Sequence, residues 1–165
     1  MTNVLDLKIL GDCICTFGVF DGVHDGHKFL ISHVINQAKK LGKKSIIITF
    51  DIDPDELFKT EFTKLMPSKN RINTLKKLDV DDVIVLDFMK IKDISPKLFL
   101  DFIFKENTPY AIHVGSNFYF GRKASGNIEL LKKWGEDNNM NVYVYDLLKK
   151  NGVVISSTNI RKGIL

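Results

Sequence analysis

The stretch CICTFGVFDGVHDGH, residues 13–27, decides the expected fold because it joins a strand to a helix through a glycine-rich turn. Its first part, Cys13 to Phe17, is a nearly continuous apolar run, as expected for a parallel strand buried on both faces. Glycines at positions 18, 22 and 26 then allow tight turns. Beyond them, apolar residues recur every three or four positions up to Leu41, and Gly42 is a typical helix stop. The stretch therefore predicts a strand, a turn and an amphipathic helix.

The same alternation of strand and helix patterns continues through the chain. Further apolar runs of strand length occur at residues 45–50, 83–86, 111–114 and 142–145. Helical patterns follow Pro67-Ser68, Ser95-Pro96 and Asn127. This alternation predicts an α/β fold, namely a doubly wound (Rossmann-like) parallel sheet of five strands with helices on both faces. At 165 residues, with no linker or internal repeat, the sequence predicts a single domain over residues 1–165.

Composition and charge narrow the class of protein. The chain has 24 Lys and Arg against 20 Asp and Glu, a net charge of +4, which suits an anionic ligand but is modest for a nucleic-acid-binding module. Its apolar stretches are too short to cross a membrane, and no signal peptide is visible at the N-terminus. Cys13 and Cys15 are expected to be reduced and buried. These features predict a cytoplasmic protein with no nucleic-acid or membrane partner, and they leave its protein partners unknown.

Candidate site residues lie in three segments, each of which directly follows an apolar run. In a parallel sheet of this kind, ligands bind beyond the carboxyl ends of the strands. Residues 18–27 combine three glycines with His24 and His27 just before a helix, an arrangement suited to a phosphate group. The segment lacks the Gly-x-Gly-x-x-Gly and Gly-Lys-Ser/Thr patterns of dinucleotide and phosphate loops. Zinc is disfavoured, because two histidines supply too few ligands.

Two later segments add aromatic and cationic groups at the same edge of the sheet. Residues 115–126 form a glycine-bounded loop with aromatic residues, an amide and a basic pair, which can stack on a planar ring or pack into the core. Residues 155–161 place hydroxyl groups ahead of Arg161, where they can cap a helix or bind an anion together with the guanidinium. The sequence therefore predicts further ligand-binding groups, Arg161 among them, beside the two histidines.

These three segments carry a resemblance to a known family. Residues 19–27, VFDGVHDGH, resemble the His-x-Gly-His signature of the nucleotidyltransferase superfamily, and most closely its bacterial FAD synthetase branch. Residues 115–121 resemble that branch's Gly-x-Asn/Asp-Phe-x-Phe-Gly stretch, and residues 155–161 resemble the Ile-Ser-Ser-Thr-x-Ile-Arg motif of the superfamily. The resemblance covers nearly the whole chain. It implies a fold of the nucleotidyltransferase type and FMN adenylyltransferase activity, which makes FAD and pyrophosphate from ATP and FMN.

The resemblance also implies roles for individual residues. The catalytic residues would be His24, His27, Ser157, Thr158 and Arg161. These residues would also bind ATP, together with Gly18 and Phe20. The flavin would contact Asn117, Phe120 and Phe58. The implied reaction is direct in-line attack of the FMN phosphate on the α-phosphorus of ATP, with Mg²⁺ carried by the nucleotide and no metal ligand assigned to protein side chains.

Some features depart from the family pattern or leave other interpretations open. Ile52-Asp53-Pro54 stands where the family usually has Pro-His-Pro, which bears on flavin specificity. Bifunctional members also carry a riboflavin kinase domain, so these 165 residues are expected to be either a stand-alone adenylyltransferase or part of a longer protein. Alternative functions are a related nucleotidyltransferase with another phosphate acceptor, and a non-catalytic flavin or nucleotide sensor. His33, His113 and Asp21 are expected to be structural, and the acidic loop at 51–56 to be a mobile lid.

Overall fold

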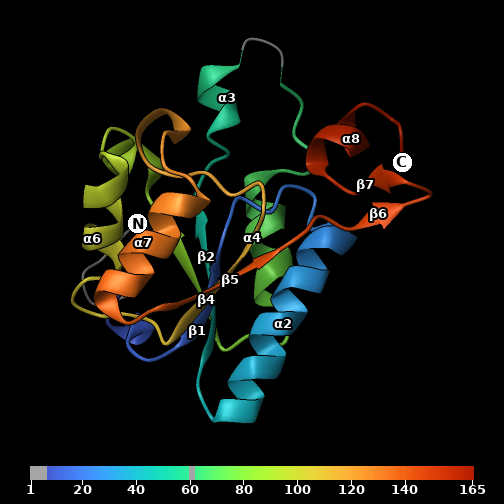
Figure 1. Ribbon diagram of the computed structural model, residues 1–165. Helices are drawn as coiled ribbons and strands as arrows, with labels where there is room; N and C mark the ends of the chain where they lie inside the picture. Colours follow the sequence, from blue (N-terminus) through green and yellow to red (C-terminus); the bar gives the residue numbers. More distant parts are fainter. Residues whose placement is uncertain (1–6, 60–61) are drawn as a thin grey trace.

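The structure is a computed structural model, and it describes residues 7–59 and 62–165. Its central feature is a five-stranded sheet in the order β3-β2-β1-β4-β5, in which every neighbouring pair is parallel (Figure 1). The strands are β1 (Ile14–Phe17), β2 (Ser45–Phe50), β3 (Asp82–Leu86), β4 (Ala111–Gly115) and β5 (Asn141–Tyr145). The predicted parallel sheet is therefore confirmed, and each strand begins and ends within one residue of its expected bounds.

The most apolar strands lie where the sheet is covered on both faces. All of β1 is buried, as are all residues of β2 except Phe50. β1 is central, and its Ile14 is paired with Ser45 of β2 on one side and with Ala111 of β4 on the other. The residues of β5, at an edge, are exposed or partly buried. The continuous apolar runs of the sequence thus mark the centre of the sheet, where burial of apolar surface contributes most to stability.

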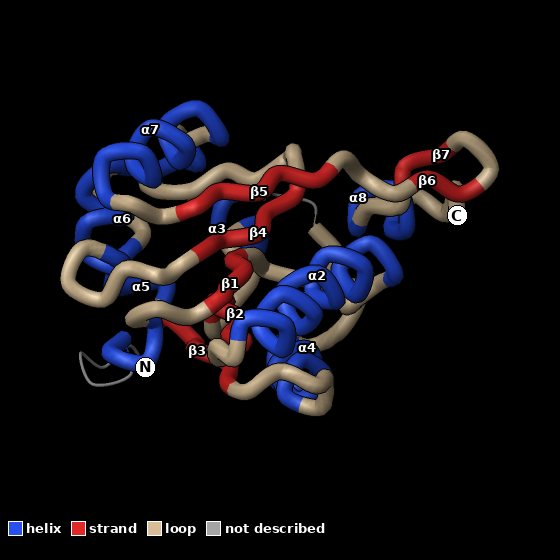
Figure 2. The backbone as a smooth tube through the Cα atoms, turned by 60° about the horizontal axis from the view of Figure 1, so that its bottom comes forward, coloured by secondary structure: helices blue, strands red, loops and turns tan. Residues whose placement is uncertain are grey.

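Helices cover both faces of the sheet (Figure 2). The two helices α2 (Asp25–Leu41) and α4 (Ser68–Lys76) lie on one face, and α6 (Pro96–Phe104) and α7 (Ile128–Asn138) lie on the other. Shorter elements connect them: η1 (Lys8–Leu10), α3 (Asp55–Phe58), α5 (Phe88–Ile91), η2 (Arg122–Ala124), the hairpin of β6 (Lys149–Lys150) and β7 (Val153–Val154), and α8 (Ser157–Arg161). Helices on both faces were expected from the alternating pattern, whereas α3 and α5 were not.

Each face of the sheet has its own apolar core. The larger cluster lies under α6 and α7 and includes Ile103 and Trp134. A smaller cluster joins α2 and α4 to the sheet through Ile31, Leu75 and Ile47. The helix stop expected at Gly42 is present, since this residue ends α2 in the left-handed conformation with φ of 66°.

Some expectations concern the environment of the chain. Cys13 and Cys15 are buried and free, as expected. Among residues 7–59 and 62–165, none of the helices is both long enough and apolar enough to span a membrane. The N-terminal residues, on which the absence of a signal peptide was argued, lie outside the described part of the chain.

Candidate active site

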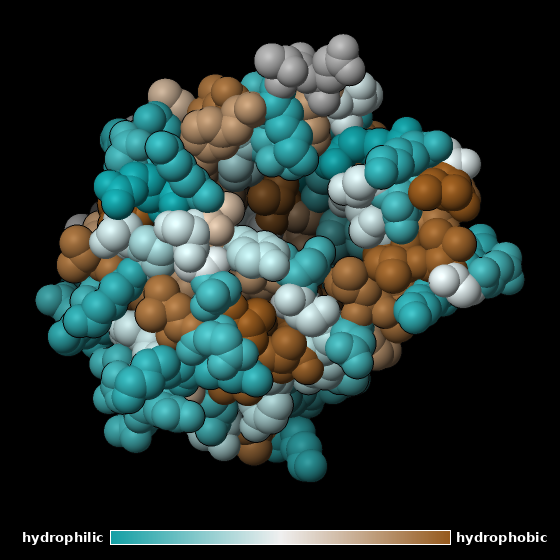
Figure 3. All heavy atoms as spheres, turned by 45° about the horizontal axis from the view of Figure 1, so that its top comes forward, coloured by the Kyte–Doolittle hydropathy of each residue, from teal (hydrophilic) through white to brown (hydrophobic). Residues whose placement is uncertain are grey.

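A cleft lies at the carboxyl end of the sheet, where the connections after β1 and β4 lead in opposite directions. It has a volume of about 350 Å³, within the range of small-molecule sites. Figure 3 brings this end of the molecule forward and shows the hollow. All three segments singled out in the sequence contribute to its lining. The predicted site residues that line it are Gly18, Phe20, His24, His27, Asn117, Ser157, Thr158 and Arg161.

His24 and His27 are fixed at the N-terminus of α2 by hydrogen bonds to the helix backbone. His24 is the N-cap, and its Nδ1 accepts from the N–H groups of Gly26 at 3.1 Å and His27 at 3.4 Å. In return, the N–H of His24 donates to Nδ1 of His27 at 3.3 Å. The two side chains thus form a reciprocal capping box, and their rings stack with centroids 3.5 Å apart.

These capping bonds also determine which nitrogen carries the proton. A neutral imidazole that accepts at Nδ1 holds its proton on Nε2. Burial, with a smaller contribution from His24, lowers the pKa of His27 to about 3. Burial also lowers the pKa of His24, although Asp25 and Asp21 oppose the shift. Near pH 7 both rings are therefore neutral Nε2–H donors in the lining of the cleft.

The turn that precedes α2 is shaped by Phe20. Its backbone is left-handed, with φ of 61°, which is uncommon for an aromatic residue. Its ring packs edge-on against His27, with centroids 5.2 Å apart. The same ring lies over Gly18, where an added Cβ would come within 2.9 Å of it. Glycine at position 18 therefore leaves the space that keeps Phe20 against the imidazole.

The C-terminal segment meets the histidine segment across the cleft. The helix α8 begins after Ser156, whose Oγ accepts from the N–H of Asn159 at 3.1 Å. Ser157 instead donates from Oγ to the backbone carbonyl of Asp21 at 2.8 Å. The expected capping role thus belongs to Ser156, while Ser157 joins two segments that are far apart in the sequence.

Arg161 forms an ion pair with Asp21, a partner that the sequence alone did not indicate. The guanidinium carbon lies 4.4 Å from the centroid of the Phe62 ring. Asp21 is buried, and its carboxylate also accepts from the N–H of Leu65 at 3.1 Å. Nε of Arg161 is buried without a hydrogen-bond partner among the described residues. The guanidinium is therefore held in the lining of the cleft by Asp21, while its Nε is buried behind the surface.

Asp53 lies on the same side of the cleft as Arg161. Its side chain is buried, Oδ1 accepts from the N–H of Asp55 at 3.0 Å, and Oδ2 is 3.9 Å from Nη2 of Arg161. Burial raises the pKa of Asp53. The departure from the family pattern at residues 52–54 thus places a carboxyl group in the lining of the cleft, and the acidic loop that follows contains the short helix α3.

The loop after β4 provides an amide and two aromatic rings. Asn117, Phe118 and Tyr119 all line the cleft. Tyr119 is 61% exposed, so its ring is accessible to a planar ligand. These residues form the aromatic surface that the sequence predicted for this loop, with Phe118 and Tyr119 as members that the resemblance did not single out.

Two predicted flavin contacts lie outside the lining of the cleft. Phe120 is 4% exposed and packs in the core, with ring centroids 6.2 Å from Phe99 and 5.4 Å from Phe118. Phe120 forms a backbone bridge across the loop, and its buried ring lies beneath the aromatic surface rather than in it. Phe58, on the short helix α3, is 60% exposed, contacts Phe88 edge-on with ring centroids 6.1 Å apart, and is not among the residues that line the cleft.

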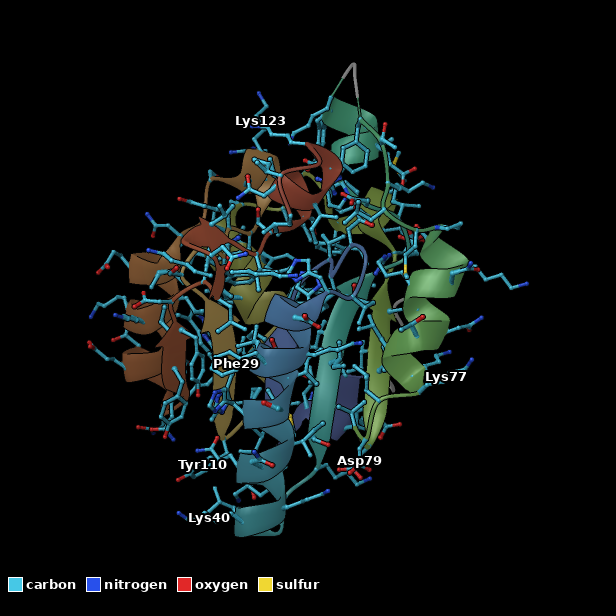
Figure 4. The ribbon with its side chains drawn as sticks, turned by 90° about the vertical axis from the view of Figure 1, so that its right-hand side faces the viewer. Phe29, Lys40, Lys77, Asp79, Tyr110 and Lys123 are labelled. Atoms are coloured by element: carbon cyan, nitrogen blue, oxygen red, sulfur yellow. The ribbon has the colours of Figure 1, made fainter. Side chains whose placement is uncertain are left out.

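The two other histidines lie behind one wall of the cleft. Nδ1 and Nε2 of His113 are each 2.7 Å from a partner, the hydroxyl of Tyr145 and Oε1 of Gln37. His33 stacks on Tyr145 with centroids 4.5 Å apart. Tyr145 and Phe29 line the cleft, and Figure 4 shows Phe29 on α2. These histidines thus support an aromatic wall rather than entering the lining themselves.

Comparison with known proteins bears on this arrangement. A sequence model of the FAD synthetase family matches residues 6–159. Bifunctional riboflavin kinase/FMN adenylyltransferases from Buchnera aphidicola, subspecies Schizaphis graminum and Acyrthosiphon pisum, are 35% and 32% identical over 96% and 95% of this chain. The protein of that name from Escherichia coli K12 is 28% identical over 92%. The chain spans about half the length of these relatives, 52%, 51% and 50% respectively.

Solved structures show the same architecture. A crystal structure of a macrolide-efflux protein from Streptococcus pneumoniae matches 100% of this chain and 64% of its own, with a TM-score of 0.81 and 25% identity. A lipopolysaccharide core biosynthesis protein from Thermoplasma volcanium, at 18% identity over 85% of this chain and 98% of its own, has a TM-score of 0.52 and supports the fold alone. The family match extends over most of the sequence, and the three motifs line one cleft. The chain belongs to the FAD synthetase family.

Proposed function

We propose that the chain is an FMN adenylyltransferase, which transfers AMP from ATP to the phosphate of FMN and releases pyrophosphate. The observation that carries this proposal is the pair of imidazoles at the N-terminus of α2, whose Nε2–H donors share one cleft with Arg161. FMN is proposed as the acceptor because the relatives are named riboflavin kinase/FMN adenylyltransferases and because aromatic rings line the same cleft as the histidines.

The proposed reaction requires positioning and charge stabilisation. The phosphate of FMN is largely ionised near neutral pH, so its attack on the α-phosphorus needs no general base. A bond forms between an FMN phosphate oxygen and the α-phosphorus, while the bond to the bridging oxygen of pyrophosphate breaks. Negative charge then increases on the pyrophosphate. Two neutral Nε2–H groups and the positive end of the α2 dipole are suited to stabilise it.

We assign the β- and γ-phosphates of ATP to the segment that begins α8. Arg161 lines the cleft, and the N–H groups of a guanidinium are strong donors to phosphate oxygen. The hydroxyl of Thr158 lines the same cleft. The ion pair with Asp21 holds the guanidinium near this position before ATP arrives. Ser157, which donates a hydrogen bond to the Asp21 carbonyl, would hold the two phosphate-binding segments together. Its hydroxyl oxygen would still be able to accept a hydrogen bond from water or another donor at the phosphate.

We assign the flavin ring to the aromatic side of the cleft. Asn117 offers an amide to the polar edge of the ring, and Tyr119 offers an exposed aromatic face. Phe120 would then act from below, by supporting Phe118. Phe58 would reach the flavin from α3 at the outer edge of the site.

Mg²⁺ is proposed to enter with ATP. Within residues 7–59 and 62–165, no group of three or more His, Cys, Asp or Glu side chains is arranged to hold a metal ion. The carboxylate of Asp21 is already engaged by Arg161 and by the N–H of Leu65. Mg²⁺ commonly binds through substrate phosphates and water, which fits this donor set. When bound, the ion would neutralise part of the phosphate charge.

A cytoplasmic location is proposed on the basis of the thiols. Cys13 and Cys15 are free and buried, and free cysteines are typical of proteins in reducing compartments.

The proposal is tested by incubating the purified chain with ATP, MgCl₂ and FMN and separating the products by chromatography. A new FAD peak, accompanied by quenched flavin fluorescence, is the expected result. Parallel reactions with CTP, or with other phosphate acceptors, test for a related nucleotidyltransferase. A thermal shift with flavin but no product with any nucleotide and acceptor would overturn the proposal in favour of a flavin sensor.

A further inference from the structure

Arg71 is a buried arginine beneath the cleft, outside the set of site residues. It extends from α4, is 1% exposed, and is the largest of the fully buried side chains. Nη1 donates to the carbonyl of Val19 and to Oγ1 of Thr49, both at 2.8 Å, and Nη2 donates to the carbonyl of Phe50 at 2.7 Å. One guanidinium therefore joins the turn after β1 to the end of β2.

The charge of Arg71 is held by carbonyl and hydroxyl oxygens rather than by a direct ion pair. In the part of the chain that the structure describes, no carboxylate forms an ion pair with it. Burial lowers the pKa of Arg71, while Asp53 and Asp21 oppose the shift from a greater distance. An arginine remains charged at neutral pH in any case. Burying an arginine only to connect two strands is costly, so its position next to an anion-binding cleft needs an explanation.

A continuous series of contacts leads from Arg71 to the catalytic imidazole proposed above. The carbonyl that Arg71 binds belongs to Val19, directly before Phe20. Thr49 Oγ1 donates to the same carbonyl at 3.2 Å, so two donors fix this peptide. Phe20 follows in its left-handed conformation, and its ring packs against His27 at 5.2 Å. A change in the peptide at Val19 would thus alter the support of the imidazole.

We propose that Arg71 is a positioning residue, which holds the Val19 peptide so that Phe20 keeps His27 in place for phosphate binding. The inference rests on the proposed adenylyltransferase activity, because it assigns His27 to the transferring phosphates. Arg71 itself touches no substrate. Its effect passes through backbone and ring contacts, so it must disappear when His27 is absent.

The test is a double-mutant cycle between Arg71→Met and His27→Ala, with kcat for FAD formation as the readout. Misplacement of a reacting group by about 1 Å can cost about 100-fold in rate, so Arg71→Met is expected to lower kcat about 10- to 100-fold. In the His27→Ala background the same change should lower kcat less than about threefold, because groups that act as a unit are not additive. FMN affinity, measured by fluorescence quenching, should stay unchanged. Losses that multiply in the double variant would overturn the proposal.

Three further variants separate positioning from folding and from charge. Lys69→Met removes an exposed charge from the same helix and should leave kcat unchanged. Arg71→Lys keeps the charge but has three N–H donors on one nitrogen in place of the planar fork, and should restore part of the kcat lost in Arg71→Met. If Arg71→Met does not fold, Thr49→Val replaces it in the cycle, since that change removes one acceptor of Arg71 and one donor to Val19. A loss of about three- to tenfold with Thr49→Val, absent in the His27→Ala background, is then expected, and an equal loss in both backgrounds would overturn the proposal.

A second readout does not depend on the reaction. The ¹⁵N shifts of His27 in the ligand-free protein should show the single Nε2–H tautomer in the wild type and in Arg71→Lys, and a tautomer mixture in Arg71→Met. Unchanged shifts in Arg71→Met would contradict the positioning role. Failure of the wild-type chain to make FAD would instead contradict the proposed function and leave this measurement to decide the structural link.

Discussion

Replacing His27 with alanine separates the two tasks that the structure gives this residue. The change removes the Nε2–H that faces the cleft, and loss of one donor of this kind typically lowers kcat about 100- to 1000-fold. It also removes Nδ1, which accepts from the N–H of His24 at 3.3 Å. Loss of a capping interaction costs about 1 kcal/mol, which lowers Tm by about 2–4 °C for a protein of this size. The affinity for FMN should be retained, because the residues proposed to bind the flavin ring belong to a different segment, the loop after β4.

The measurements for His27→Ala are kcat by chromatography of FAD, Tm by calorimetry and FMN affinity by fluorescence quenching. A matched control is Asn127→Ala, which removes the N-cap of α7, where Oδ1 accepts from the N–H of Leu130 at 3.0 Å. That variant should show a similar fall in Tm with no change in kcat. Turnover of His27→Ala within about tenfold of the wild type would refute the assignment of this imidazole to the transferring phosphates.

Three further predictions concern stability and flavin binding. The pKa of His27 is lowered to about 3 in the folded state, so the unfolded chain takes up the proton first as the pH falls below about 6.5. Between pH 7 and pH 5, the free energy of unfolding of the wild type should therefore fall by about 2 kcal/mol more than that of His27→Ala, as measured by urea titration. Equal decreases in the two proteins would contradict this prediction. Asp21→Asn breaks the buried ion pair with Arg161 and should lower the free energy of unfolding by about 3 kcal/mol in the same assay. A decrease below about 1 kcal/mol would contradict a stabilising role for this ion pair. Phe120→Ala should lower the free energy of unfolding by about 3–5 kcal/mol, because this ring is buried. Tyr119→Ala should raise the KM for FMN with little change in Tm, because this ring is exposed. The reverse pattern would make Phe120 the flavin contact and Tyr119 the core residue.

The strands, the long helices and the histidine pair could be predicted because their signals are local. Apolar runs of strand length, glycines after a strand and apolar residues at helical spacing reflect backbone geometry over a few residues. Gly42 illustrates this, since its position after an apolar pattern indicated the left-handed stop that the structure has. The two histidines could be placed at a helix start for the same reason, although their roles as mutual caps needed the observed geometry.

Other features could not be predicted because they depend on tertiary contacts. Arg161 and Asp21 are 140 positions apart, and no local pattern relates them. Phe120 and Tyr119 are neighbours of the same chemical kind, and the fold of their loop decides which ring is buried. Arg71 did leave a signal, because it shares one face of its helix with Leu75, four positions later. A charged residue on an apolar face indicates a buried polar contact, and this pattern would have identified it.

The bonds from Asp21 to Ser157 and Arg161 have a consequence for the synthesis of the protein. They join residues 136 and 140 positions apart, so the histidine turn leaves the ribosome long before its partner helix α8 is made. The nascent chain can form β1 and α2 early, but at that stage it lacks Arg161 as a partner for Asp21. A chain that ends before residue 157 would therefore carry both histidines but neither of the residues that join α8 to the histidine turn.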